Sequence, residues 1–196
     1  MSIVRLYNAY TKYSESINAK SKSEELGLPE LSEALRAFNQ LKERGVIEDY
    51  AIGGGQAIIY HSVPLSTYDL DLFVILRNDA DYHAIYQYFR EKGNKIEDEY
   101  IYIDDMAVQI LPNISPLFNE TVEQAHKVII EGIPSKVARV EYLIVIALGA
   151  FRPKDKYHIL QIKDKANKDL LDKILDRFDD TDGKLRKRYK SILARA

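Results

Sequence analysis

A glycine turn followed closely by two aspartates is the feature that most constrains this chain. Gly53 to Gly55 come after the apolar run Tyr50-Ala51-Ile52 and before Gln56-Ala57-Ile58-Ile59-Tyr60, which predicts a strand, a tight turn and a helix. A turn without Cβ atoms lets a phosphate approach the backbone, and the N–H groups of a helix start attract anions. The turn therefore predicts a phosphate site, with Gly54 and Gly55 as its binding residues.

The two aspartates predict a metal site beside that turn. Asp69 and Asp71 flank Leu70 in an apolar run that continues to Leu76, and the period of a strand places both carboxylates on one face. Two neighbouring anions repel each other and resist desolvation unless a divalent cation lies between them, and magnesium prefers carboxylate and phosphate oxygens. The alternative is that Asp69 braces a turn after Ser66-Thr67, which leaves Asp71 alone in the strand.

The spacing of these residues resembles a known signature. Gly54-Gly55, thirteen further residues and then Asp69-Leu70-Asp71 resemble the DNA polymerase β-like nucleotidyltransferase superfamily. With Thr67 included, the segment is most similar to the AbiEii abortive-infection toxin and other minimal nucleotidyltransferases. Residues 108–112 resemble the third core strand of that family, residues 140–144 resemble the following helix, and residues 152–155 resemble an Arg-x-Lys-Asp segment.

The resemblance covers residues 30 to 165 and carries expectations about fold and function. It implies an α+β nucleotidyltransferase fold, a small mixed β-sheet flanked by helices, with a helical C-terminal extension. It also implies a nucleoside triphosphate, magnesium, and transfer of a nucleotidyl group to a hydroxyl of RNA, such as tRNA, or of a protein. The implied setting is a toxin–antitoxin or phage-defence system with a cognate antitoxin. The implied catalytic and metal-binding residues are Asp69 and Asp71, and the implied substrate-binding residues are Gly54, Gly55, Thr67, Gln109, Arg152, Lys154 and Asp155.

Four positions depart from the family pattern. Leu65 replaces an arginine, Gln109 replaces a third carboxylate, Ala147 replaces a lysine and His158 replaces a late aspartate. Each change removes charge from a place where transfer chemistry uses it, because electrostatic stabilisation is often the largest catalytic contribution. The departures favour an alternative function, a catalytically reduced module that keeps the fold to bind a nucleotide or a protein.

Several of these residues also have an ordinary structural interpretation. Thr67 is either a hydroxyl that supports the site or a packed strand residue. The run that starts at Arg152 and Lys154 also fits a simple helix start with Asp155 as its cap. Lone histidines such as His61 are more often structural than catalytic.

The length of 196 residues fits one structural domain. We expect a nucleotidyltransferase-like core with N-terminal helices over residues 1–150 and a basic helical extension over residues 151–196. Hydrophobic periodicity predicts helices at 29–44, 80–92, 117–125, 139–150, 156–162, 164–178 and 184–195. It predicts strands at 100–103 and 106–111 around the turn Asp104-Asp105, and one strand or two short ones over 127–133.

Composition narrows the cellular setting and the partners. No apolar run reaches the length of a membrane span, and Met1 to Arg5 lacks a signal-peptide core, so we expect a cytoplasmic protein that does not enter a membrane. The absence of cysteine excludes disulfides and thiolate metal sites. Residues 152–196 carry 14 Lys and Arg against 8 Asp, while residues 1–151 carry 14 against 22 acidic residues. This basic end either contacts RNA or is an ordinary solvated helix face, which includes Lys184, Arg186, Lys187, Arg188 and Lys190.

Overall fold

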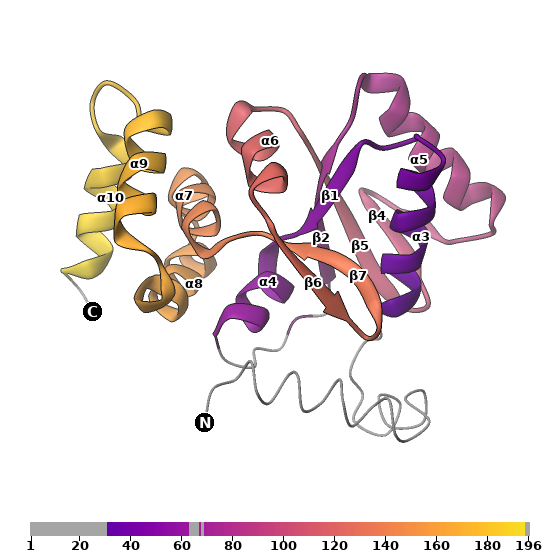
Figure 1. Ribbon diagram of the computed structural model, residues 1–196, viewed down its shortest axis with the longest axis horizontal. Helices are drawn as coiled ribbons and strands as arrows, with labels where there is room; N and C mark the ends of the chain where they lie inside the picture. Colours follow the sequence, from indigo (N-terminus) through magenta and orange to yellow (C-terminus); the bar gives the residue numbers. More distant parts are fainter. Residues whose placement is uncertain (1–30, 63–66, 68, 195–196) are drawn as a thin grey trace.

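The computed structural model describes residues 31–62, 67 and 69–194 (Figure 1). Leu65, which departs from the family pattern, and any of the expected N-terminal helices within residues 1–30 lie outside this part of the chain. The described strands form one seven-stranded sheet with the order β3-β4-β5-β2-β1-β7-β6. The β2–β5 and β1–β7 pairs are parallel and the other pairs are antiparallel, which confirms the predicted mixed sheet. The strands are β1 (Asp49–Ile52), β2 (Asp69–Ile75), β3 (Ile96–Glu97), β4 (Tyr100–Ile103), β5 (Met106–Pro112), β6 (His126–Ile130) and β7 (Ile133–Val137).

Helices flank the sheet and then gather at one end of the molecule. Figure 1 shows α7 to α10 together on the side of the sheet away from α3 and α5. Among the described residues, no helix is both long and apolar enough to span a membrane. The division of the chain between residues 150 and 151 stays a prediction. The helices are α3 (Ser32–Glu43), α4 (Gly54–His61), α5 (Asp79–Glu91), α6 (Pro116–Glu123), α7 (Val140–Ala150), α8 (Pro153–Ile162), α9 (Lys168–Phe178) and α10 (Lys184–Leu193), with the 3₁₀ turn η1 (Lys163–Lys165).

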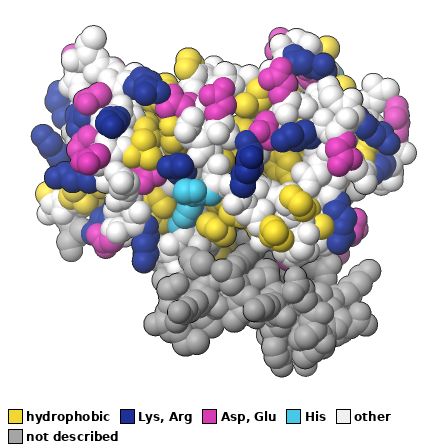
Figure 2. Space-filling view, viewed as in Figure 1, with side chains coloured by type: hydrophobic (Ala, Val, Ile, Leu, Met, Phe, Trp, Pro, Cys, Tyr) yellow, Lys and Arg dark blue, Asp and Glu magenta, His cyan; other side chains and the backbone are white. Residues whose placement is uncertain are grey.

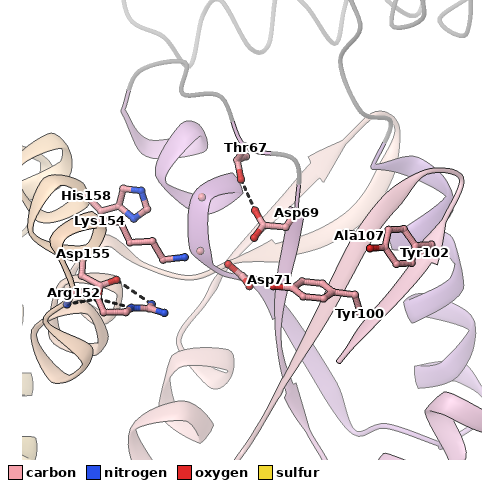
Figure 3. Close-up of a pocket in the computed structure, with 12 residues that line it drawn as sticks. Thr67, Asp69, Asp71, Tyr100, Tyr102, Ala107, Arg152, Lys154, Asp155 and His158 are labelled. Atoms are coloured by element: carbon pink, nitrogen blue, oxygen red, sulfur yellow. Dashed lines mark hydrogen bonds and ion pairs between the residues drawn. The ribbon is translucent and has the colours of Figure 1, made fainter. Parts of the chain in front are cut away.

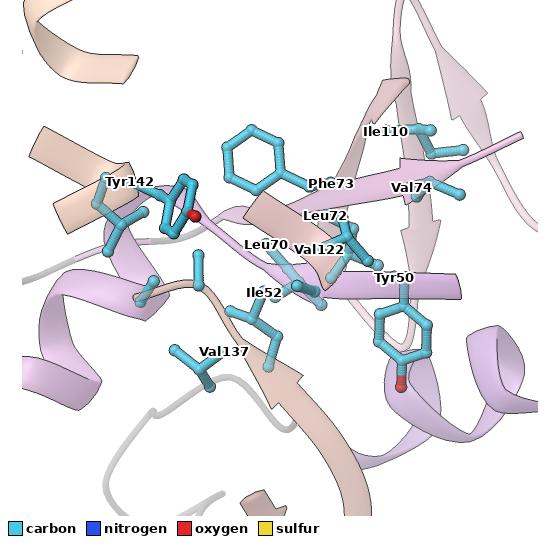
Figure 4. Packing of buried hydrophobic residues seen from close by; sticks show 14 of the residues in the cluster. Tyr50, Ile52, Leu70, Leu72, Phe73, Val74, Ile110, Val122, Val137 and Tyr142 are labelled. Atoms are coloured by element: carbon cyan, nitrogen blue, oxygen red, sulfur yellow. The ribbon is translucent and has the colours of Figure 1, made fainter. Parts of the chain in front are cut away.

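The two faces of the central strand β2 have different surroundings. Leu70, Leu72 and Val74 are buried on one face, where Tyr50 of β1 contacts Phe38 of α3 with ring centroids 5.8 Å apart. On the other face, Phe73 contacts Phe118 of α6 at 5.0 Å. Figure 4 shows Tyr50 and Phe73 extending to opposite sides of the sheet.

Because side chains alternate along a strand, Asp69 and Asp71 lie on the same face of β2 as Phe73. Phe73 is buried at 2% exposure and packs against α6. The two aspartates stand nearer the start of the strand and line a pocket instead. One face of β2 therefore changes from a polar site to hydrophobic core within three positions.

Local hydrogen bonds explain where the observed helices differ from the predicted ranges. Helix α8 begins at Pro153, three residues before the predicted start, because the Asp155 side chain accepts a hydrogen bond from the backbone N–H of Arg152. Helix α9 begins at Lys168, later than predicted, because the Asn167 side chain accepts from the N–H of Leu170. Residues 127–133 belong to two strands, and the Glu131-Gly132 turn between them has positive φ at both positions.

Some of the basic side chains at the C-terminal end form ion pairs and hydrogen bonds within the molecule. Arg186 forms ion pairs with Asp172 at 2.9 Å and with Asp176 at 2.5 Å. Arg188 donates hydrogen bonds to the carbonyl oxygens of Leu148 and Gly149, at the end of α7 where the helix dipole is negative. Figure 2 shows Lys and Arg interspersed with Asp and Glu over α9 and α10. These contacts favour the structural interpretation of the basic end.

Candidate active site

The glycine turn joins β1 to α4 and is bonded directly to β2. Strand β1 ends at Ile52 and α4 begins at Gly54, as the sequence predicts. The backbone N–H of Gly53 donates to the carbonyl oxygen of Asp71 at 2.8 Å. This bond fixes the start of α4 beside the aspartate strand, so the predicted phosphate site and metal site are adjacent.

A side chain at either of the next two glycines would collide with the site. Gly54 has a φ of +49°, and a Cβ atom there would lie 1.6 Å from Oδ2 of Asp71. A Cβ atom on Gly55 would lie 2.6 Å from Oγ1 of Thr67. The glycines are required because the carboxylate and hydroxyl approach the backbone where a side chain would otherwise stand.

Asp69 and Asp71 both line the pocket and have different partners. The Thr67 hydroxyl donates to Oδ1 of Asp69 at 2.6 Å, which supports its interpretation as a hydroxyl that orients the site. Burial, followed by the charge of Asp69, raises the pKa of Asp71 to about 6, although Lys154 and Arg152 act in the opposite direction. Within the described residues, neither aspartate forms an ion pair within 4.0 Å.

Helix α8 contributes a basic wall opposite the aspartates. Figure 3 shows Arg152 and Lys154 directed toward Asp69 and Asp71. Asp155 is committed to Arg152, since its two oxygens accept from the Nε and Nη2 atoms of Arg152 at 2.9 and 3.1 Å. Asp155 thus holds Arg152 in place and caps α8, while Lys154 remains directed into the pocket.

The glycine turn, β2, α8 and the hairpin of β4 and β5 enclose a pocket of about 470 Å³. His158 lies on the α8 side, and burial lowers the pKa of its imidazole. The residues that line the pocket are Gly54, Gly55, Thr67, Asp69, Asp71, Tyr100, Tyr102, Ala107, Arg152, Lys154, Asp155 and His158. Eight of the nine predicted site residues are therefore brought together in one pocket, and Gln109 is the exception.

Tyr100, Tyr102 and Ala107 line the pocket but were not predicted from the sequence. They come from the β4–β5 hairpin, in which Tyr102 pairs with Ala107, and Ala107 in turn pairs with Asp69. The alternation Tyr-Ile-Tyr-Ile before the Asp104-Asp105 turn indicates that Tyr100 and Tyr102 share one face of their strand. Both turn residues have positive φ, and the register across a two-residue hairpin follows from its turn.

Gln109 lies beside Asp71 in the β2–β5 register but does not line the pocket. Its Nε2 atom donates to Oε1 of Glu99 at 3.4 Å. Ala147 is in α7 and does not line the pocket. The cations that face the aspartates come from Arg152 and Lys154 on the next helix.

The described residues fit a magnesium ion held by two carboxylates. Asp69 and Asp71 share one strand face in a pocket where burial, and then repulsion from Asp69, disfavours ionisation of Asp71. Magnesium commonly takes one or two protein carboxylates and completes its shell with phosphate oxygens and water. No group of three or more His, Cys, Asp or Glu side chains suited to a metal occurs in the described part of the chain, so the third carboxylate has no replacement there.

Comparison with known proteins identifies the fold. No protein-family model matches the chain, and no curated protein matches it. The solution structure of the antibiotic-resistance factor ANT(2'')-Ia aligns with a TM-score of 0.55 and 16% identity, over 84% of this chain and 95% of that chain. The crystal structure of ANT(2'')-Ia with adenylyl-2''-tobramycin aligns with a TM-score of 0.52 and 18% identity, over 81% and 96%. The chain therefore has the nucleotidyltransferase fold that was expected.

Proposed function

We propose that this chain binds a nucleoside triphosphate with magnesium and transfers a nucleotidyl group to an acceptor hydroxyl. The observation that carries the proposal is the arrangement of charge in the pocket. Asp69 and Asp71 face Arg152 and Lys154 across a glycine turn that has no room for a side chain. Phosphates need cations and exposed N–H groups, and the metal that accompanies them needs carboxylates.

Each part of the pocket has a distinct role in the proposed reaction. Asp69 and Asp71 would hold the magnesium, which supplies charge neutralisation for the phosphates when it is bound. The N–H groups at Gly54 and Gly55 face the phosphates, and Lys154 pairs with their outer oxygens. Thr67 keeps the Asp69 carboxylate oriented through its hydrogen bond. Arg152, held by Asp155, adds a fixed positive charge where negative charge develops on the leaving diphosphate.

The acceptor and the biological setting are further parts of the proposal. By resemblance to the AbiEii toxin, the acceptor is a hydroxyl of RNA, such as tRNA, or of a protein, in a toxin–antitoxin or phage-defence system with a cognate antitoxin. ANT(2'')-Ia was solved with adenylyl-2''-tobramycin, so the same fold also carries nucleotidyl transfer to a small molecule. Acceptor assays should therefore include RNA, protein and aminoglycoside candidates.

Binding of nucleotide tests the proposal directly. The midpoint of thermal unfolding is measured with ATP, GTP, CTP or UTP, each with and without magnesium. At least one nucleotide is expected to raise the midpoint when magnesium is present, because a ligand that binds only the folded state stabilises it. The increase should disappear in Asp71→Asn and persist in Asp182→Asn, which changes an exposed aspartate. The absence of any shift with all four nucleotides contradicts the proposal.

A second candidate function is favoured by Gln109. A glutamine replaces the expected third carboxylate and turns toward Glu99, and the described residues offer no other carboxylate cluster. The chain would then bind a nucleotide and act as a sensing or protein-binding module without turnover. Nucleotide binding with no transfer to any acceptor supports this module, while transfer that is lost in Asp69→Asn eliminates it.

A further inference from the structure

Tyr100 lines the pocket on the side opposite α8. Its strand β4 is separated from β2 by β5, and the register places Tyr100, Gln109 and Asp71 in one row across the sheet. Two strand spacings amount to about 9.6 Å, a gap that a tyrosine side chain can cross in large part. Figure 3 shows the Tyr100 ring extending toward Asp71. Gln109, which lies between them in this row, donates a hydrogen bond to Glu99 and does not line the pocket.

Tyr100 is the pocket hydroxyl best placed to meet a bound triphosphate. Among the described residues, Thr67, Tyr100 and Tyr102 bring hydroxyl groups to the pocket. The Thr67 hydroxyl already donates to Asp69. Tyr102 lies farther from Asp71 in Figure 3, and the ammonium group of Lys95 lies 4.9 Å from its ring centre. The Tyr100 hydroxyl has no hydrogen-bond partner within the part of the chain that the structure describes.

We propose that Tyr100 is a self-acceptor, which the chain modifies with a nucleotidyl group from its own bound nucleoside triphosphate. This inference rests on the proposed function. The Tyr100 hydroxyl oxygen forms a bond to the α-phosphorus, and the bond from that phosphorus to the bridging oxygen of the β-phosphate breaks. Diphosphate leaves with that oxygen, and the phenolic proton leaves with the diphosphate or with water. The product is a phosphodiester that joins Tyr100 to the nucleoside.

The modification would regulate the same pocket. A nucleotide attached to Tyr100 stays within the 470 Å³ pocket and takes the space through which an external hydroxyl must approach. It also adds a negative charge close to Asp69 and Asp71. The modified chain is therefore expected to be inactive toward external acceptors until the phosphodiester is hydrolysed.

Mass spectrometry of the full chain tests the proposal. The chain is incubated with magnesium and each of the four triphosphates, and fragmentation locates any added nucleotide. The expected result is one nucleotidyl group on Tyr100, which is absent in Tyr100→Phe and present in Tyr157→Phe, a matched change on the exposed face of α8. Addition to another residue, or no addition, overturns the proposal.

A second measurement tests whether Tyr100 lies against the bound nucleotide, and it requires no nucleotidyl transfer. A tyrosine-directed nitrating reagent is applied with and without magnesium and a non-hydrolysable triphosphate. Bound nucleotide is expected to protect Tyr100 while exposed Tyr157 stays reactive. Equal nitration of Tyr100 in both conditions, with nucleotide bound, overturns the proposal.

The two proposals fail in distinguishable ways. If no nucleotide raises the unfolding midpoint, the proposed function fails and self-modification fails with it. If nucleotide binds and external acceptors are modified while Tyr100 stays unmodified and reactive, only the self-acceptor proposal fails.

Discussion

Asp71 and Asp155 line the same pocket and have opposite surroundings. Asp155 is 7% exposed at its side chain and accepts three hydrogen bonds from Arg152, one from the backbone and two from the guanidinium group. Asp71 faces Asp69, and its pKa is raised to about 6. Asp155 therefore stabilises the fold, whereas the ionised form of Asp71 destabilises it. A carboxylate held without a cationic partner in a pocket is a candidate ligand-binding group.

The largest expected effect comes from filling the space above Asp71. In Gly54→Ala, the new Cβ atom would lie 1.6 Å from the carboxylate oxygen, so Asp71 must move and binding of magnesium with nucleotide is expected to be lost. Gly45→Ala is the matched control, because Gly45 also has a positive φ but no atom within 4 Å of its added Cβ. It should lose about 1 kcal/mol of stability from backbone strain alone. Titration calorimetry that finds equal nucleotide affinity in both variants contradicts this role for Gly54.

Removing the charge of Asp71 is expected to stabilise the ligand-free protein. The pKa rises from 3.8 to about 6 on folding, and a difference of about two pH units corresponds to about 3 kcal/mol. Asp71→Asn should therefore raise the free energy of unfolding at pH 7 by up to about 3 kcal/mol, measured by chemical denaturation. Asp182→Asn, at an exposed position, should change it by less than about 0.5 kcal/mol. A destabilised Asp71→Asn contradicts the proposed strain.

The contribution of Asp71 to the free energy of unfolding is expected to depend on pH. The folded state holds the Asp71 proton more tightly than the unfolded state, so stability from this group is present below pH 3.8 and is lost as pH rises to about 6. The difference in unfolding free energy between Asp71→Asn and the unmodified chain should therefore grow across this window and stay constant above it. Saturating magnesium should reduce the difference. A difference that does not vary with pH would show that Asp71 ionises normally.

Removing the carboxylate of Asp155 is expected to destabilise the protein, by less than the change at Asp71 stabilises it. Asp155→Ala removes the cap of α8 and leaves Arg152 without its partner, which should cost about 2 kcal/mol of stability. Glu97→Ala is the control, because the Lys95–Glu97 pair is more than half exposed on both side chains, and solvent screening leaves such a surface pair with little effect on stability. If both variants lose the same free energy of unfolding in denaturant titrations, Asp155 does not stabilise the fold more than an exposed carboxylate does.

The smallest expected effect is at Thr67. Thr67→Val removes one hydrogen bond to Asp69 and keeps a similar volume. The loss of about 1 kcal/mol corresponds to roughly fivefold weaker binding of magnesium with nucleotide. Thr67→Ser retains the hydroxyl and should restore the affinity in the same calorimetric titration. Unchanged affinity in the valine variant would assign Thr67 to packing.

The sequence predicts those parts of the site that depend on local pattern. The glycine turn and the Asp-x-Asp strand follow from residue types and the period of a strand. Arg152 and Lys154, some eighty residues later in the chain, were assigned by resemblance alone. The alternation of residues 100–103 places Tyr100 and Tyr102 on one face of β4, but Tyr100 reaches the site only because β4 pairs with β5 and β5 pairs with β2, and the second pairing is a non-local contact. The start of α9 was missed because a single side chain, Asn167, caps the helix.

The β4–β5 hairpin gives the pocket one wall that can be altered independently. Its two strands are joined by the short Asp104-Asp105 turn, both residues of which are exposed. Surface turns of this kind tolerate inserted residues, because lengthening a loop costs little entropy. An inserted loop would extend the tyrosine wall and leave the glycine turn, β2 and α8 unchanged. The hairpin is thus a natural position at which to engineer a new acceptor preference onto a constant nucleotide site.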